Sequence, residues 1–263
     1  NTQRALHLAQ VLERENKYRK EIDTHTLEEA LELTESTFDP LRDKALVLAK
    51  ENWHSGVIGI VASRLIERFY RPTVMITIEN GIGKGSARSI PGFDIYNALD
   101  EVSDLLEQFG GHTYAAGLSV KGDRIEEFRD RLNDIAVRQL SDDDLIPKLR
   151  IDAEIDLKDV NGTLLSALKM FAPFGQDNPM PVFMSHNVQL ADYPRVVGHN
   201  HLKFQVKSNG RSIDCIGFNL GDLIRRLDPM RPNNHIVYTV EENDWGGQIY
   251  LQLRIRDVKN GNL

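Results

Sequence analysis

The sequence predicts an α/β (α+β) domain that follows a long helix and precedes an all-β domain. Apolar residues recur at helical spacing across residues 2–22, with charged residues between them. Between residues 45 and 140, short β-branched runs alternate with amphipathic runs of helical period, which is typical of a mixed domain. After residue 148, five or six short strand-like runs follow with little helix, which indicates a β domain.

The first predicted element is a connecting helix over residues 1–36. Its apolar residues fall near one stripe and are Ala5, Leu8, Val11, Leu12, Tyr18 and Ile22. Thr26 and Glu29 have capping-box spacing, which predicts that a second helical run starts there and continues to about Leu33. Because the sequence does not begin with Met and so charged a helix needs a surface to pack on, we expect a preceding domain outside this chain.

The α/β domain is predicted over residues 37–141. Strands are expected at 45–49, 72–78, 85–89 and 118–120, and helices at 57–69, 95–109 and 124–140. Gly110 and Gly111 are expected to end the helix 95–109, because glycine is common just past a helix end. The acidic stretch 141–147 ends in proline and predicts the domain boundary.

The β domain is predicted over residues 148–263. Its expected elements are strands at 149–157, 182–190, 202–206, 212–218, 236–240 and 250–255, a short helix at 164–171 and a hairpin turn at 243–247. Many short strands with little helix favour a small barrel. An oligonucleotide-binding (OB) fold is the leading choice, because its strands form a surface suited to single-stranded bases.

Composition narrows the class of protein. The 263 residues are 41% apolar and 27% charged, as in soluble globular proteins, and no apolar run is long enough for a membrane span. A single cysteine, Cys215, excludes an internal disulfide and a multi-cysteine zinc site, and it fits a cytoplasmic origin. The net charge of −7 argues against a generally basic nucleic-acid-binding surface. Because the acidic excess lies within residues 101–180, a local basic groove elsewhere stays open.

No catalytic metal centre is predicted in this chain. The sequence contains no Asp-His-His run and no paired aspartates at predicted strand ends. His199 and His201 lack nearby carboxylates and are interpreted as surface histidines. Spacing alone does not exclude a Ser-His-Asp triad, because triads form in space, but no nucleophile-elbow motif is present.

The strongest candidate site is the run from Gly110 to Gly117. Gly110 and Gly111 let the backbone approach a ligand and supply N–H groups. His112 can donate to a phosphate or base as a supporting catalytic residue that positions the substrate, Tyr114 can stack, and Ala116 keeps the surface low. The same residues also fit a helix end followed by a tight turn of small residues, and the residues alone leave both interpretations open.

A second candidate is the glycine-rich run 81–89, which lacks the order of a Walker A loop. Arg88 can hold a phosphate bidentately, with the hydroxyls of Ser86 and Ser89 beside it. Strand alternation predicts that Ser86 and Arg88 share one face. The alternative is an ordinary glycine-rich turn with an exposed arginine.

The third candidate precedes the helix 57–69. Trp53 and His54 form a polar and aromatic cluster at a helix N-terminus, where anions and nucleotides bind readily. The alternative places Trp53 in the core and makes Ser55 the helix cap.

The β domain adds basic and aromatic residues across adjacent predicted strands, a composition that suits a single-strand groove. These residues are Tyr193, Arg195, His201, Lys203, Phe204, Lys207 and Arg211. The alternative is an ordinary barrel with a solvated charged face.

Four ordered segments resemble one known family. Residues 52–60, 85–89 and 109–117 resemble the DHH-associated domain of the bacterial RecJ family, in order and in spacing. Residues 173–179 resemble the segment that opens the OB domain of that family, with Asp177 where a glycine is common, which predicts a local turn difference. Residues 1–36 resemble its connecting helix, so the resemblance covers essentially the whole chain.

The resemblance implies a 5′→3′ exonuclease for single-stranded DNA in repair and recombination. The family holds two Mn²⁺ or Mg²⁺ ions in an N-terminal domain with an Asp-His-His motif, which this sequence lacks, so the chain alone is expected not to cleave DNA. Arg88 with Ser86 would hold a phosphate near the 5′ end, and Gly110, Gly111 and His112 would lie along the nucleotide nearest the metals. Expected partners are single-stranded DNA, a single-strand-binding protein and a repair helicase, for a monomer of the bacterial cytoplasm without membrane contact.

Other functions stay open. A DHH phosphoesterase could act on short oligonucleotides or cyclic dinucleotides, although an added OB domain argues against so small a substrate. A non-catalytic module for single-strand or protein binding belongs to a different class and can describe the chain by itself. The C-terminal region of alanyl-tRNA synthetase shares a similar glycine motif but not the order of the OB segments.

Overall fold

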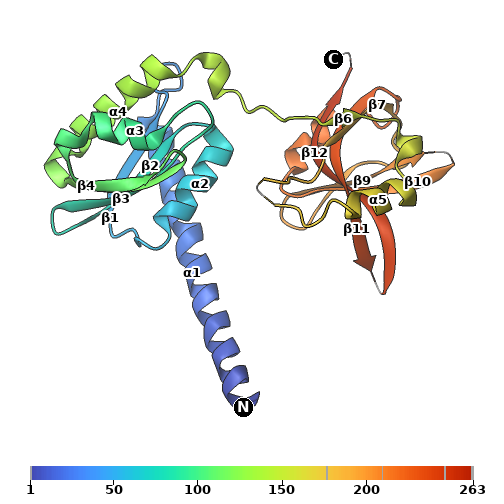
Figure 1. Ribbon diagram of the computed structural model, residues 1–263, viewed down its shortest axis with the longest axis horizontal. Coiled ribbons are helices and arrows are strands. Elements are labelled where there is room, and N and C mark those ends of the chain that lie inside the picture. The colour runs from blue at the N-terminus through green and yellow to red at the C-terminus, as the bar shows by residue number, and fades with distance from the viewer. Residues whose placement is uncertain (1, 176, 209, 246, 262–263) are drawn as a thin grey trace. The chain divides into compact units, whose positions relative to one another are not determined.

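The computed structural model describes residues 2–175, 177–208, 210–245 and 247–261 (Figure 1). The chain divides into two compact units, Asn1–Lys148 and Leu149–Leu263. Each unit has its own sheet and its own apolar core. Among the described residues, no helix is both long enough and apolar enough to cross a membrane.

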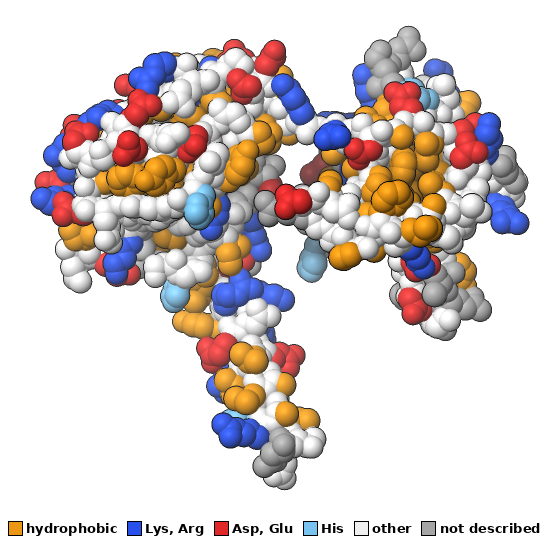
Figure 2. Space-filling model, in the orientation of Figure 1, with side chains coloured by type: hydrophobic (Ala, Val, Ile, Leu, Met, Phe, Trp, Pro, Cys, Tyr) orange, Lys and Arg blue, Asp and Glu red, His pale blue; other side chains and the backbone are white. Residues whose placement is uncertain are grey.

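The first unit begins with α1 (Thr2–Thr37), a single uninterrupted helix. The predicted restart at Thr26 is wrong, because Thr26 lies buried within the helix rather than at a cap. Only the C-terminal half packs on the unit, through Asp23, Thr26, Ala30 and Thr34 at helical spacing. Leu8, Leu12 and other apolar side chains of the N-terminal half are exposed (Figure 2).

The sheet of the first unit has the order β1-β2-β3-β5-β4. β1 and β2 are parallel and the other neighbours are antiparallel. The strands are β1 (Leu46–Glu51), β2 (Thr73–Glu79), β3 (Ile82–Arg88), β4 (Leu106–His112) and β5 (Ala115–Lys121).

Helices cover the two faces of this sheet unequally (Figure 1). α3 (Ile95–Glu101) and α4 (Ile125–Gln139) lie on one face, over an apolar core that reaches across β1, β2, β3 and β5. On the other face, α2 (Ile58–Phe69) and α1 pack over Leu48 of β1 and Met75 of β2. The part of this second face that belongs to β3, β5 and β4 therefore has no apolar cluster above it among the described residues.

The predicted helix 95–109 is wrong beyond Glu101. The chain leaves α3, makes a short 3₁₀ turn over Ser103–Leu105 and continues as β4, which pairs with β5. Gly110 and Gly111 are strand residues and do not end a helix. The segment pairs with β5 as the edge strand of the sheet, and this tertiary contact outweighs its local helical spacing.

The second unit is mostly β. Its sheet order is β6-β7-β11-β12-β10-β9-β8. The strands are β6 (Ala153–Glu154), β7 (Phe183–Val188), β8 (Arg195–Val197), β9 (His201–Ser208), β10 (Arg211–Gly217), β11 (Asn234–Trp245) and β12 (Gln248–Asn260), with one helix, α5 (Gly162–Lys169), in the described ranges. The predicted strand 149–157 is wrong for most of its length, since only β6 pairs there. The predicted hairpin turn 243–247 includes residue 246, which lies outside the described residues.

The sheet of the second unit curls back toward its own beginning. Directly after β7, the backbone of residues 189–191 bonds to β9: Lys207 N–H donates to the Gln189 carbonyl at 2.9 Å, and Ala191 N–H to the Gln205 carbonyl at 2.8 Å. Its core, which includes Phe204, Cys215, Tyr238 and Leu253, lies inside the curl. Burial raises the pKa of the Tyr238 hydroxyl to about 12, against the opposing effect of its hydrogen bond with Ser185.

Candidate nucleic-acid interface

The face of β3, β5 and β4 beside α2 brings the main predicted residues together. Arg88 pairs with Ala115, which pairs with His112, and Ser86 pairs with Gly117, which pairs with Gly110. Directly paired residues point to the same face of a sheet. The structure therefore places Ser86, Arg88, Gly110 and His112 on one surface, and Ser86 and Arg88 share a strand face as the alternation predicts.

The floor of this surface consists largely of bare backbone. Gly110 and Gly117 are both exposed in the middle of paired strands. A Cβ atom added at Gly110 would meet no heavy atom within 4 Å, so nothing in the described structure fills that space. A ligand can approach the backbone here more closely than any side chain would permit.

Arg88 lies between this floor and the start of α2. Its Nη1 donates to Ser86 Oγ at 3.1 Å and to the Ala87 carbonyl at 2.8 Å. Gly59, in the first turn of α2, faces both side chains, because a Cβ there would lie 2.9 Å from Arg88 Nη2 and 2.9 Å from Ser86 Oγ. The sequence reasoning did not select Gly59 as a site residue, although its place in a glycine-rich helix start was a signal.

His54 lies just before α2 and is exposed. Its Nδ1 accepts a hydrogen bond from Gly56 N–H at 3.0 Å, which leaves Nε2 as the protonated nitrogen of the neutral ring. The helix cap is Val57, without a side-chain capping bond, and not Ser55. The N-terminus of α2 therefore presents backbone N–H groups, with His54 exposed just before the helix and Gly59 of its first turn beside Arg88.

Trp53 does not belong to this surface. Its side chain is 3% exposed and packs in the cluster under α1 and α2. Its Nε1 donates to Glu29 of α1 at 2.8 Å, and Glu29 also accepts from Lys50 at 2.7 Å. The prediction that the Trp53 side chain binds nucleic acid is therefore wrong, and only the part of the alternative that places Trp53 in the core is confirmed.

The β4–β5 hairpin tip is tied to the loop that precedes α3. Ser89 N–H donates to the Tyr114 carbonyl at 3.0 Å, and Thr113 Oγ1 donates to Asp94 at 3.2 Å. Ser89 follows β3, and its hydroxyl donates to the Phe93 carbonyl at 2.7 Å, so its predicted role beside a phosphate stays a prediction. Tyr114 remains 56% exposed at the tip, where its ring is accessible to a base.

Gly111 and Ala116 shape the hairpin itself. A Cβ at Gly111 would lie 2.4 Å from the Ala115 carbonyl oxygen and 2.5 Å from the Ala116 Cα, so only glycine fits. Ala116 is 6% exposed and points into the core on the α3 face. The Ala116 side chain therefore packs beneath the surface, and the part of Ala116 in nucleic-acid binding stays a prediction.

In the second unit, the structure contradicts the prediction for one aromatic residue, Phe204. Phe204 is fully buried in the core, so its predicted role as a stacking residue is wrong. Lys203 and Lys207 alternate with it on β9 and point to the opposite, outer face. Arg195 on β8 and Arg211 on β10 are exposed.

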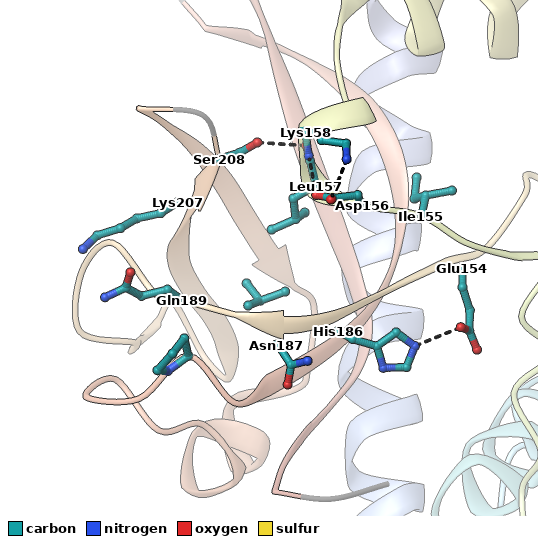
Figure 3. A pocket seen from close by; sticks show the side chains of 12 residues that line it. Glu154, Ile155, Asp156, Leu157, Lys158, His186, Asn187, Gln189, Lys207 and Ser208 are labelled. Carbon is teal, nitrogen blue, oxygen red and sulfur yellow. Dashed lines mark hydrogen bonds and ion pairs between the residues drawn. The ribbon is translucent and has the colours of Figure 1, made fainter.

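A hollow of about 670 Å³ lies between β7, β9 and the segment after β6 (Figure 3). Its charges largely pair with one another: Lys158 contacts Asp156 at 3.1 Å, and His186 contacts Glu154 at 3.1 Å. The backbone N–H and the ammonium of Lys158 lower the pKa of the Asp156 carboxyl. Of the predicted residues only Lys207 lines this hollow, which makes it a poor phosphate site.

Comparisons with known proteins identify both units. The family model of the DHHA1 domain matches residues 42–138, and that of the RecJ OB domain matches residues 151–257. Single-stranded-DNA-specific exonuclease RecJ of Bacillus subtilis is 38% identical over 255 residues, which cover 95% of this chain and 32% of that protein. The protein of the same name from Escherichia coli is 32% identical over 261 residues, which cover 95% of this chain and 44% of that protein.

Solved structures agree with the sequence comparisons. RecJ from Thermus thermophilus, in crystal structures with Mg²⁺ and with Mn²⁺, matches 96% of this chain with TM-scores of 0.76 and 0.77 at 26% identity. The matched regions are 37% and 36% of those chains. This chain belongs to the RecJ family. It spans about a third to less than half of the length of the curated RecJ proteins described above.

The described part of this RecJ-family chain does not fit a metal centre. No group of three or more His, Cys, Asp or Glu side chains within it is arranged to hold an ion. His112 is exposed at the end of β4, and its cross-strand neighbours are Ala115 and Arg88. The surface built by the DHHA1 unit is thus equipped to bind an anion and orient a nucleotide through N–H, hydroxyl and guanidinium donors.

Proposed function

We propose that this chain is the C-terminal, DNA-binding part of a RecJ-like 5′→3′ exonuclease for single-stranded DNA, which acts in repair and recombination. The observation that carries the proposal is the surface defined by Ser86, Arg88, Gly110, His112 and Gly117. It combines a guanidinium, a hydroxyl and an imidazole with an exposed backbone floor, which is the donor set that a phosphate and its sugar require.

Each group has a distinct role in the proposal. Arg88 holds a phosphate near the 5′ end, because its guanidinium can make two parallel bonds to phosphate oxygens. Its present bonds to Ser86 and Ala87 fix its direction before the ligand arrives. Gly110 and Gly117 allow the nucleotide to lie close to the sheet, and His112 at the strand end donates to it and positions it.

The bond-breaking groups lie outside this chain in the proposal. T. thermophilus RecJ has been solved with Mg²⁺ and with Mn²⁺, whereas the described residues here do not form a ligand set for such ions. The two parts of the enzyme therefore divide the work, and this part binds and orients. The chain alone is expected to bind single-stranded DNA and to release no nucleotides when Mn²⁺ or Mg²⁺ is added.

A binding assay on the whole chain tests the phosphate role. We expect Arg88→Gln to weaken binding of a 3′-labelled, 5′-phosphorylated single strand about tenfold, since a hydrogen bond to a charged group contributes about 1.5–3 kcal/mol. The same strand with a 5′-hydroxyl should lose much less. Arg138→Gln is the matched control, because Arg138 pairs with Glu101 on the α4 side of the sheet.

A second variant, Gly59→Ala, tests whether binding depends on the position of the Arg88 guanidinium as well as on its charge. Gly59→Ala keeps the guanidinium but places a methyl group 2.9 Å from it, and alanine favours helix by about 1 kcal/mol. We expect weaker binding of the 5′-phosphorylated strand with no loss of thermal stability. If Arg88→Gln and Gly59→Ala both leave the preference for a 5′-phosphate unchanged, the proposed phosphate site is wrong.

A further inference from the structure

The outer face of the second unit carries three cations in register, on β8, β9 and β12. Arg195 of β8 pairs with Lys203 of β9, which pairs with Ile216 of β10. Ile216 pairs with Arg254 of β12, which pairs with Thr239 of β11. Because paired residues share a face, the three cations form one line across the strands. Asp192 contacts Arg195 at 3.3 Å and Glu241 contacts Arg254 at 3.5 Å, so each arginine is held in place at the edge of the row.

Phe218 lies at one end of this row and is 49% exposed. The guanidinium carbon of Arg254 lies 5.2 Å from the centre of its ring, and the His201 ring lies 5.3 Å away at a steep angle of 71°. His201 is itself fixed, since its Nδ1 accepts from Asn219 N–H at 3.1 Å. An exposed ring held by a cation and an imidazole presents a rigid aromatic surface to solvent.

Tyr250 supplies a second exposed ring on the same face. It lies four residues before Arg254 on β12, which corresponds to about 13 Å along the strand. Its side chain is 47% exposed and lines a hollow of about 280 Å³ with Lys203, Asp214, Asn243 and Gln252. The hollow thus has an aromatic wall, one ammonium group, and amide and carboxylate groups that can pair with polar edges of a base.

We infer that Phe218 and Tyr250 are base-stacking positions for single-stranded DNA, with Arg254, Lys203 and Arg195 meeting the phosphates between and beside them. The inference deepens the proposed function and rests on it. Exposed rings with cations beside them match a chain that alternates phosphates with aromatic bases, and Lys203 lies between the two arginines that pair with carboxylates. Bases in a duplex are already stacked and paired, so this face selects single strands.

Fluorescence anisotropy of the whole chain tests the inference, with a 3′-labelled thymidine strand of about 20 nucleotides that exceeds one OB-fold site. We expect Phe218→Ala and Tyr250→Ala each to weaken binding about tenfold, because stacking contributes about 1–3 kcal/mol per base. Phe218→Tyr and Tyr250→Phe keep the rings and should retain binding. Phe171→Ala is the matched control, since Phe171 is equally an exposed aromatic of this unit, at 64%, but follows α5.

An abasic strand with the same phosphates identifies the contact as stacking. It should bind more weakly than the thymidine strand and should be insensitive to Phe218→Ala and Tyr250→Ala. Equal losses on both strands, or no loss on the thymidine strand in variants with wild-type thermal unfolding, overturn the inference. In that case the response of Arg88→Gln to a 5′-phosphate decides the proposed function separately. A wild-type chain that does not bind single-stranded DNA overturns both.

Discussion

The two sheets of this chain expose faces of opposite construction. In the first unit, the face of β3, β5 and β4 beside α2 is defined by missing side chains, with Gly110 and Gly117 exposed in paired strands. In the second unit, the outer face carries long side chains such as Lys203 and Arg254. A ligand on the exposed glycine backbone must lie close to the sheet in one position. Flexible lysine and arginine side chains can instead bind phosphates at many positions along a DNA strand. If both proposals hold, the first unit fixes one nucleotide in position and the second tolerates many positions of the strand.

The largest expected effect is on the free energy of unfolding of the second unit, and it distinguishes the buried Phe204 from the exposed Phe218. Phe204→Ala should destabilise this unit by about 3–5 kcal/mol, because it removes a fully buried ring from the core. Phe218→Ala should cost less than about 1 kcal/mol, since its ring is half exposed. Calorimetric unfolding of both variants measures the difference. Similar costs would mean that the outer face is structural and would remove the contrast between the two sheets.

The next largest effect distinguishes Gly111 from Gly110 in β4, by stability for the first and by DNA binding for the second. Gly111→Ala should destabilise the first unit by about 2 kcal/mol, because its Cβ would lie 2.4 Å from the Ala115 carbonyl oxygen. Gly110→Ala meets no atom within 4 Å and should leave the melting temperature unchanged while it weakens DNA binding. Melting curves and anisotropy on both variants check this pair. Unimpaired DNA binding by Gly110→Ala would show that the floor is not a contact surface.

Much of this architecture follows from local patterns, and some of it does not. The alternation of Ser86 and Arg88 correctly predicts their common face. The same rule applied to β9 separates Phe204 from Lys203, so the burial of Phe204 was readable from the sequence. In contrast, Leu106 and Phe109 continue the helical spacing of α3, and only pairing with β5 makes them strand residues.

The site depends in part on contacts between segments distant in sequence. Trp53 is an aromatic residue of the kind that often binds nucleotides. It is buried here because α1 packs over it, and Glu29 of α1, 24 positions away in the sequence, accepts the hydrogen bond from its indole N–H. Gly59 faces Arg88 only because α2 packs beside β3. Both relations depend on how the helices pack on the sheet, so local patterns do not specify these contacts. The proposed roles of Arg88, His112 and Tyr114 stay predictions.

The smallest expected effect concerns the attachment of α1. Hydrogen bonds from Lys50 first, and then from Trp53, lower the pKa of Glu29 from its usual 4.5. The unfolded chain therefore binds this proton more readily, so the contribution of Glu29 to stability is present above pH 4.5 and is lost as the pH falls through its lowered pKa. Thermal unfolding between about pH 3 and pH 6 should show a shallower acid decline for Glu29→Gln than for wild type. A decline of equal steepness in both would assign the acid sensitivity to other carboxylates.

Only the C-terminal half of α1 is docked on the first unit, and this has a mechanical consequence. Asp23 reaches Arg64 of α2 at 2.9 Å, and no residue described here packs against the exposed apolar side chains of the first turns. The helix before Asp23 is about 32 Å long at 1.5 Å per residue. A tilt of about 10° at the docked half would move the far end by about 5 Å. A small tilt at the stripe from Asp23 to Thr34 would therefore become a displacement of several residues' rise at the N-terminal end of α1.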